Sequence, residues 1–297
     1  ALNFDPQSGI QAVKAYSLPA PSFSSPAVTS DKIIVACCST DNDSVIALNR
    51  DSQGNIGDKI WGKAVGAVGH ASPVIFEDTV FVTCAQVSDK KSVTKIVALN
   101  VNDGTILWNA TLGTPLKSSN VADSTPTIYN GVLYAASADG TVYALDTTNG
   151  TTLWSTEIYT VPLFSEAVLQ SSPAYADNFV YIGTPAGLFY ALDSSTGNPS
   201  WSYTTFINWT AAPILGSPVV SNGLVFFADE NGVLYSLGRF STTTKPVSGR
   251  IISVPIRLPE ALWWDSFYAD TLVVKNVSSI TFKLLDANGN VLTDNLA

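Results

Sequence analysis

The hydrophobic positions of this chain fall into short runs separated by polar turns, and the same order of runs returns five times. Each unit begins at a proline and continues with a short apolar run, a polar turn and a second run rich in branched and aromatic residues. Another turn and a third run follow, and in the first four units a fourth run ends in tryptophan. Runs of this composition, bounded by Gly, Asn and Asp, are typical of β-strands. The pattern therefore predicts four short antiparallel strands per unit.

Two anchors set the period of the repeat. The prolines, each preceded by small or hydroxyl-bearing residues, are 47, 53, 47 and 45 residues apart, at Pro26, Pro73, Pro126, Pro173 and Pro218. The tryptophans are 47, 46 and 47 residues apart, at Trp61, Trp108, Trp154 and Trp201. No segment has sustained helical periodicity, which argues against a helical solenoid. A period of this size with four strands predicts an all-β fold, a β-propeller of four-stranded antiparallel blades.

Each tryptophan closes a similar stretch, such as "ALDTTNGTTLW" at residues 144–154. The alanine leaves room for a bulky indole, while the Asp or Asn and the glycine four residues before the tryptophan form a tight turn that aims it. The tryptophans recur with the blade and not with a single site. We therefore interpret Trp61, Trp108, Trp154 and Trp201 as blade-docking residues rather than as a ligand-stacking platform.

This stretch resembles the tryptophan-docking motif of the pyrroloquinoline-quinone-type (PQQ-like) β-propeller repeat family, Ala-Leu-Asp-x-x-x-Gly-x-x-x-Trp, and the likeness covers residues 20–240. The resemblance implies a propeller with five clear blades, and six or seven blades remain open. The family includes quinoprotein alcohol dehydrogenases, an outer-membrane assembly lipoprotein, tetrathionate hydrolases and cell-surface proteins. The resemblance therefore implies a fold and no single function.

We expect two regions, a propeller over residues 1–240 and a degenerate last blade or small β appendage over residues 241–297. Residues 1–16 look like the second half of a blade, with Val13 where the indole would fall. Such a half-blade would close the ring by supplying the outer strands of the last blade. Residues 268–290 align with the fourth unit, which favours the degenerate blade, although "LLDANGNVL" also suits a strand pair in an appendage.

The composition of the chain indicates its location and the kinds of partner that it can bind. Charged residues make up only 13% of the 297 residues, and the net charge is −9 with 15 Lys and Arg. Nucleic-acid binding needs clustered basic residues, so a nucleic-acid partner is not expected. No apolar run is long enough for a membrane span. The low charge and the start at Ala1, which fits a mature product or a fragment, favour an extracellular, cell-surface or periplasmic location.

Five Asn-x-Ser/Thr acceptors support secretion of a glycoprotein. All of them fall in predicted turns or strand ends, where a glycan can be accommodated. The candidate glycosylation sites are Asn42, Asn109, Asn149, Asn208 and Asn276.

The three cysteines leave several states open. Cys84 occupies the position of Cys37 in the next unit, eleven residues after the proline in both. Equivalent strands of neighbouring blades lie side by side, so a disulfide from Cys84 to Cys37 or Cys38 is conceivable in an oxidising compartment. Free buried thiols are the plain alternative. A vicinal Cys37–Cys38 disulfide is implied by the resemblance alone, because quinoprotein alcohol dehydrogenases place such a pair against their cofactor.

Catalytic chemistry finds little support in the sequence. A quinoprotein site needs a calcium ion with Asp, Glu and Asn ligands, a general-base Asp and an aromatic floor. No cluster here matches those ligands residue by residue, so we expect no cofactor, with PQQ and calcium as the alternative. His70 is the only histidine, which argues against zinc chemistry. The carboxylates at Asp41, Asp43, Glu166, Asp229 and Glu230 are interpreted as turn residues.

Aromatic residues that depart from the repeat are the best candidates for a partner surface. They lie in connections between units and near the C-terminal region, at Phe164, Phe206, Trp209, Trp263 and Trp264. We therefore expect a secreted or cell-surface binding and scaffold module with a protein or glycan partner. The alternatives are a quinoprotein-like or tetrathionate-hydrolase-like extracytoplasmic enzyme and an assembly factor that docks an edge strand of a partner.

Overall fold

The structure is a computed structural model, and it describes residues 15–39, 42–52, 55–89, 91–117, 123–161, 167–207, 210–238, 282–285 and 291–296. These residues form β-strands and turns, and none of them is helical. The chain divides into two compact units, residues 1–238 and residues 239–297. The sequence placed the corresponding boundary after residue 240.

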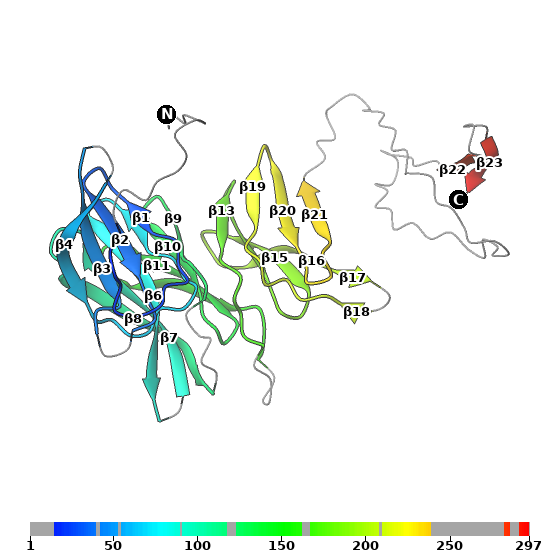
Figure 1. Ribbon diagram of the computed structural model, residues 1–297. Coiled ribbons are helices and arrows are strands. Elements are labelled where there is room, and N and C mark those ends of the chain that lie inside the picture. The colour runs from blue at the N-terminus through cyan, green and yellow to red at the C-terminus, as the bar shows by residue number, and fades with distance from the viewer. Residues whose placement is uncertain are drawn as a thin grey trace, which may run out of the picture. The chain divides into compact units, whose positions relative to one another are not determined.

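The described residues of the first unit form five antiparallel sheets of three or four strands, which are hydrogen-bonded in chain order (Figure 1). Sheet 1 has β1 (Ala27–Val28), β2 (Lys32–Ala36), β3 (Val45–Arg50) and β4 (Ile56–Lys63); sheet 2 has β5 (Val74–Phe76), β6 (Thr79–Ser88), β7 (Lys91–Asn100) and β8 (Ile106–Leu116). Sheet 3 has β9 (Thr127–Tyr129), β10 (Val132–Ala136), β11 (Thr141–Asp146) and β12 (Thr152–Glu157); sheet 4 has β13 (Ala174–Ala176), β14 (Phe179–Gly183), β15 (Leu188–Asp193) and β16 (Pro199–Thr204). Sheet 5 has β19 (Val219–Ser221), β20 (Leu224–Ala228) and β21 (Leu234–Gly238), and a short hairpin of β17 (Phe206–Ile207) and β18 (Thr210–Ala211) precedes it. The prediction of an all-β fold with four-stranded antiparallel sheets is confirmed for sheets 1 to 4, whereas sheet 5 has three described strands.

Tight turns join the first and second strands of sheets 2 to 5. The residue that opens each turn has a left-handed backbone, with φ between 48° and 52°, at Glu77, Asn130, Asp177 and Asn222. Two-residue hairpin turns need positive φ because their twist then matches the twist of the strands. Asn and Asp tolerate this conformation better than most residues, which explains the polar "YNG", "ADN" and "SNG" turns of the sequence.

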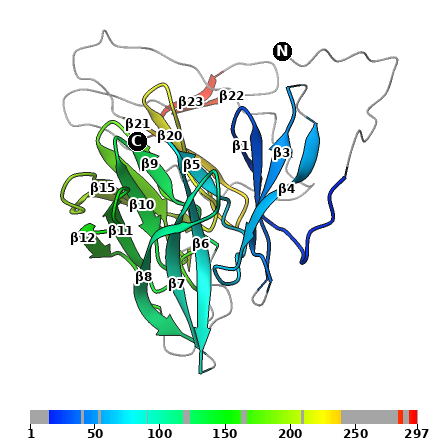
Figure 2. The same ribbon diagram turned by 90° about the vertical axis from the view of Figure 1, so that its left-hand side faces the viewer.

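Four apolar clusters lie between consecutive sheets and form the core. Neighbouring residues of one strand serve different clusters, because successive side chains point to opposite faces. On β6, Val82 packs towards sheet 1, whereas Phe81 packs against residues of sheet 3. The middle strands are therefore covered on both faces. The first strands of neighbouring sheets also contact one another, as β1 and β5 do (Figure 2).

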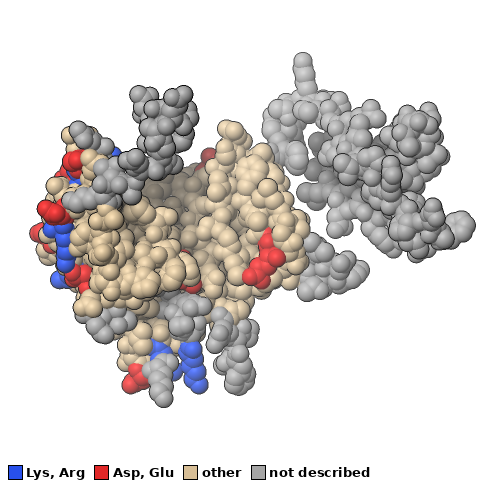
Figure 3. Space-filling model, in the orientation of Figure 1, with Lys and Arg blue, Asp and Glu red and all other residues tan. Residues whose placement is uncertain are grey.

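Sheet 2 departs from the others in length. Its strands β6, β7 and β8 have 10, 10 and 11 residues, whereas the matching strands of sheet 3 have 5, 6 and 6. The β6–β7 hairpin projects well beyond the neighbouring strands in Figure 1. On the face shown in Figure 3 the described surface is largely uncharged, with Lys and Arg gathered over sheet 1 and near the tip of this hairpin.

The second unit contributes one described hairpin, β22 (Phe282–Leu285) and β23 (Val291–Leu296), which pair in an antiparallel register with two irregularities. The choice between a degenerate blade and an appendage stays a prediction. Residues 1–14, with Val13 and most of the expected closing half-blade, lie outside the described residues.

Candidate functional site

The tryptophans of the repeat contact the next sheet along the chain. The indole Nε1 of Trp61 donates a hydrogen bond to the carbonyl of Val101 at 3.0 Å, and Trp108 donates to Thr147 at 2.9 Å. Trp154 donates to Ser194 in the same way at 2.9 Å. Within its own sheet each indole lies opposite an alanine, in the pairs Ala47 and Trp61, Ala98 and Trp108, Ala144 and Trp154, and Ala191 and Trp201.

The glycine of each repeat stretch receives the tryptophan of the preceding sheet. A Cβ placed on Gly150 would lie 2.6 Å from Trp108 Cε3, and one on Gly197 would lie 2.5 Å from Trp154 Cε3. Gly104 has the same relation to Trp61, at 2.6 Å. All three glycines also have φ between 70° and 75°. The sequence predicted a turn-forming role for this glycine towards its own tryptophan, and the contact between sheets is an additional role.

A row of hydroxyl groups connects all five sheets at the starts of their first strands. In sheets 1 to 4 the residue before the repeat proline donates its main-chain N–H to the side-chain oxygen of the equivalent residue in the next sheet. We call this row the hydroxyl ladder. Its bonds run from Ser25 N to Ser72 Oγ (3.0 Å), Ser72 N to Thr125 Oγ1 (2.8 Å), Thr125 N to Ser172 Oγ (2.9 Å) and Ser172 N to Ser217 Oγ (3.1 Å).

A second row of bonds runs one residue earlier along part of the ladder. Ser124 Oγ donates to the carbonyl of Ser171, and Ser171 Oγ donates to the carbonyl of Gly216, both at 3.1 Å. The sequence reading used the hydroxyl-Pro motif only as a landmark. The proline itself explains why the ladder starts there, because the residue before a proline is held extended and outside the strand's own pairing.

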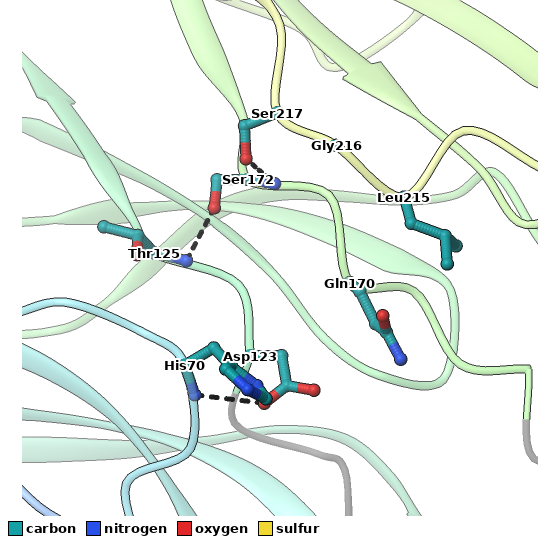
Figure 4. Close-up of a pocket in the computed structure, with 8 residues that line it drawn as sticks. All are labelled: His70, Asp123, Thr125, Gln170, Ser172, Leu215, Gly216 and Ser217. Atoms are coloured by element: carbon teal, nitrogen blue, oxygen red, sulfur yellow. Dashed lines mark hydrogen bonds and ion pairs between the residues drawn. The ribbon is translucent and has the colours of Figure 1, made fainter. Parts of the chain in front are cut away.

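A polar recess opens beside the ladder (Figure 4). Its volume is about 290 Å³, and the connections that enter sheets 2, 3, 4 and 5 all contribute to its walls. The lining residues are His70, Asp123, Thr125, Gln170, Ser172, Leu215, Gly216 and Ser217. Three of them, Thr125, Ser172 and Ser217, belong to the hydroxyl ladder, so the shape of the recess depends on the packing of successive sheets.

One end of the recess is formed by a histidine and a carboxylate. The main-chain N–H of His70 donates to Asp123 Oδ1 at 3.1 Å, and the ring Nδ1 lies 3.0 Å from the same oxygen. The side chain of Asp123 is 11% exposed and that of His70 is 66% exposed. The ring of Phe23 lies against His70 with a centroid separation of 5.3 Å. The carboxylate thus fixes the orientation of the imidazole. The sequence did not predict this pair, because Asp123 is 53 residues away from His70.

The three cysteines are free thiols, and each points at a different carbonyl oxygen. Cys37 Sγ donates to Asp43, Cys38 Sγ to Val68 and Cys84 Sγ to Val65. Burial raises the pKa of Cys84 to about 12 and also raises the pKa of the other two thiols. Of the three states that the sequence left open, the structure has the free thiols, and neither the bridge between sheets nor the vicinal disulfide is formed.

Other candidate residues are distributed over the surface or lie outside the described residues. Asn42, Asn109 and Asn149 are exposed, while Asn208 and Asn276 lie outside the described residues. Phe206 belongs to β17, and Phe164, Trp209, Trp263 and Trp264 lie outside the described residues. The aromatic partner surface therefore stays a prediction.

A quinone and calcium site can be tested against the donors that the structure describes. Among the described residues no three His, Cys, Asp or Glu side chains converge as metal ligands would. Asp229 accepts the Tyr235 hydroxyl at 2.8 Å and the main-chain N–H groups of Asn231 and Val233, which stabilises the β20–β21 turn. Cys37 and Cys38 are not bonded to each other. These contacts account for Asp229 and the cysteines alone, so the expectation of no cofactor, with PQQ and calcium as the alternative, stays a prediction.

Successive four-stranded antiparallel sheets, packed face to face and joined by repeated tryptophans, define a protein built from β-propeller-like blades. The family model described as outer membrane protein assembly factor BamB matches residues 41–253. The chain belongs to this family of PQQ-like repeat proteins, as the resemblance predicted. No curated protein matches the chain at a significant level. In addition, no helix among the described residues is long and apolar enough to cross a membrane.

Solved structures share the fold at low sequence identity. BamB from Moraxella catarrhalis is 20% identical, with a TM-score of 0.52, over 76% of this chain and 64% of that chain. The quinohemoprotein alcohol dehydrogenase from Comamonas testosteroni is 15% identical, with a TM-score of 0.50, over 74% of this chain and 41% of that one. The alignments thus span less than two thirds of either relative. At such identities the likeness shows the fold alone.

Proposed function

We propose that this protein is an extracytoplasmic binding and scaffold module that engages a protein or glycan partner at the cell surface. The observation that carries the proposal is the recess beside the hydroxyl ladder. Its walls come from four successive connections, and three of its hydroxyl oxygens are fixed by main-chain N–H groups of the preceding sheet. Preformed polar groups at fixed positions in a concave site are the usual basis of selective binding.

The same contacts favour binding over nucleophilic catalysis. A nucleophilic hydroxyl needs a base within hydrogen-bond reach that takes its proton. The ladder oxygens of Thr125 and Ser172 instead accept main-chain N–H groups, and among the described residues no ladder hydroxyl is hydrogen-bonded to the ring of His70. The groups that line the recess can therefore hold a ligand through hydrogen bonds.

The proposed location draws on composition and on the family. The family description names an outer membrane protein assembly factor, which supports a place outside the cytoplasm and a protein partner. The three described sequons, Asn42, Asn109 and Asn149, are exposed, which glycosylation would require.

A paired assay distinguishes this function from the enzymatic alternative. The immobilised protein is exposed to a panel of glycans and extended peptides, and binding is followed by interferometry. The same preparation is mixed with PQQ, Ca²⁺, an alcohol and a redox dye. We expect saturable binding of at least one panel member and no dye reduction. Dye reduction that depends on both the quinone and Ca²⁺, without any panel binding, would favour the quinoprotein instead.

A further inference from the structure

The recess presents several hydroxyl donors whose protons remain available. In the hydroxyl ladder the oxygens of Thr125, Ser172 and Ser217 accept main-chain N–H groups at 2.8, 2.9 and 3.1 Å. None of these three O–H groups donates to another described residue. A hydroxyl carries one donor and two acceptor positions, so each retains the capacity to donate to a ligand oxygen.

Gln170 adds a carboxamide to this set. Its side chain is half-buried, lines the recess and points into it in Figure 4. It makes no hydrogen bond to the described residues, although a primary amide offers two donors and one acceptor. A partly desolvated polar group without a protein partner gains free energy when a ligand supplies one. Gln170 therefore provides both kinds of hydrogen bond at the centre of the site.

Asp123 sets the charge of an acceptable ligand. Its side chain is 11% exposed, and Oδ1 is engaged by His70. The other oxygen, Oδ2, has no hydrogen-bond partner among the described residues and can accept from a ligand. A carboxylate in a partly desolvated site repels anions, and the net charge of −9 acts in the same direction. The site therefore favours a ligand that offers hydrogen-bond donors, such as hydroxyl groups, and carries no negative charge.

An apolar side chain completes the lining. Leu215 lines the recess beside the polar groups. Outside the lining, the ring of Phe23, which is 61% exposed, packs against His70. A ligand that combines adjacent hydroxyls with an apolar C–H face meets both sets of groups. A pyranose ring has this combination, and a phosphate, a carboxylate or a cation does not.

We propose that the recess binds a neutral pyranose unit of a glycan, with Gln170, Asp123 and the ladder hydroxyls as its hydrogen-bonding groups and Leu215 as its apolar contact. The volume of about 290 Å³ is near the lower end of small-molecule sites, which suits a single sugar ring. This assignment rests on the proposed binding function and specifies its ligand and its site.

Calorimetric titration with simple glycosides tests the assignment. The probes are the methyl glycosides of glucose, galactose, mannose and N-acetylglucosamine, with glucuronate as the anionic match to glucose. We expect saturable binding of one neutral glycoside, and Gln170→Ala should weaken it about tenfold or more, as loss of a ligand hydrogen bond does. Gln86→Ala, an exposed glutamine on the β6–β7 hairpin, is the matched control and should leave the affinity unchanged. Glucuronate should bind more weakly than the neutral glucoside, and Asp123→Asn should reduce this difference in affinity.

The outcomes separate this assignment from the proposed function. Equal affinities of the wild type and Gln170→Ala, or a preference for glucuronate, would overturn the sugar site. Binding of extended peptides without binding of any glycoside would also overturn it, while the binding function would stand. Binding of neither class, together with dye reduction dependent on the quinone, would reject both proposals. Circular dichroism of each variant verifies that its fold is retained.

Discussion

Single residues join neighbouring sheets through a tryptophan on one side and a glycine on the other. The indole of Trp108 donates to Thr147 and lies over Gly150, where a methyl group would come within 2.6 Å of the ring. The same pair recurs for Trp61 with Gly104 and for Trp154. The glycine is needed both for its positive φ and for the space that the indole occupies. These two requirements can be separated experimentally.

Gly150→Ala should destabilise the protein more than Gly223→Ala. Both glycines have a φ near 73°, so both substitutions incur the backbone strain of about 1 kcal/mol. No atom lies within 4 Å of a Cβ on Gly223, whereas Gly150→Ala also forces the Trp108 indole to move. The extra loss should be about 1–3 kcal/mol. Denaturant unfolding measures both variants, and equal losses would show that the indole contact is unimportant.

Thr83→Val should preserve or raise stability. The Thr83 hydroxyl on β6 is buried, and its oxygen has no hydrogen-bond partner among the described residues. Removing a desolvated hydroxyl at nearly constant volume should stabilise the fold by up to about 1 kcal/mol. The melting temperature of Thr83→Val against the wild type is the measurement. A clear loss of stability would mean that the hydroxyl is hydrogen-bonded after all.

The thiols should react in an order set by burial. Cys38 is partly exposed, while Cys37 and Cys84 are buried, so a thiol reagent at pH 8 should label Cys38 first. After denaturation without a reductant, all three thiols should react with the reagent. Release of only one thiol would reveal a disulfide and contradict the structure.

Alkaline pH should weaken the fold through Cys84. Burial raises its pKa from 9.0 to about 12 in the folded state, so the folded protein holds the proton more tightly than the unfolded chain does. The resulting stability is complete below pH 9 and is lost as the pH rises from 9 towards 12. The free energy of unfolding of Cys84→Ala should fall less steeply over this range. Parallel curves for the variant and the wild type would exclude this linkage.

At the scale of the elements, the hydroxyl ladder fixes where each first strand begins. Ser72, Thr125 and Ser172 each accept one N–H and donate another through their own main chain, so the three middle connections are bonded to both of their neighbours. The repeat proline has no N–H for strand pairing at this position. The residue before it can therefore hydrogen-bond to the neighbouring sheet. The motif therefore has a structural role, and it also forms one wall of the recess.

Thr125→Val should destabilise the protein, whereas Thr125→Ser should not. Valine removes the acceptor of the Ser72 N–H and leaves that group unpaired, which costs about 1–3 kcal/mol. Serine keeps the oxygen, as three other rungs of the ladder do. Chemical denaturation of the two variants provides the comparison. A Val variant as stable as the Ser variant would indicate that water replaces the ladder bond at no cost.

At the scale of the whole molecule, the repeat could be predicted from the sequence, whereas the recess could not. The alternation of apolar runs and the spacing of Trp61, Trp108 and Trp154 predicted the strands and their order, because each sheet is a local unit with its own turns. The recess joins four connections, and its His70 and Asp123 are 53 residues apart. No local pattern marks such a pair, because only the packing of successive sheets brings it together.

The cysteines illustrate the same limit. The equivalent positions of Cys37 and Cys84 in consecutive units indicated neighbouring strands, but the direction of each thiol depends on the pleat and the local turn. The spacing of residues in the sequence predicts which strands are neighbours, but it does not predict the side-chain orientation that a disulfide requires. The structure directs each sulfur to a separate carbonyl.

Mapping of ligand-induced amide shifts is the most direct test of the account. The ¹⁵N-labelled protein is titrated with the neutral glycoside that binds it, and backbone and side-chain amide resonances are followed. The account predicts that the largest shifts occur at Thr125, Ser172 and Ser217 and at the Gln170 carboxamide, all around the recess. Shifts confined to the β6–β7 hairpin, or shifts spread evenly over the chain, would contradict it.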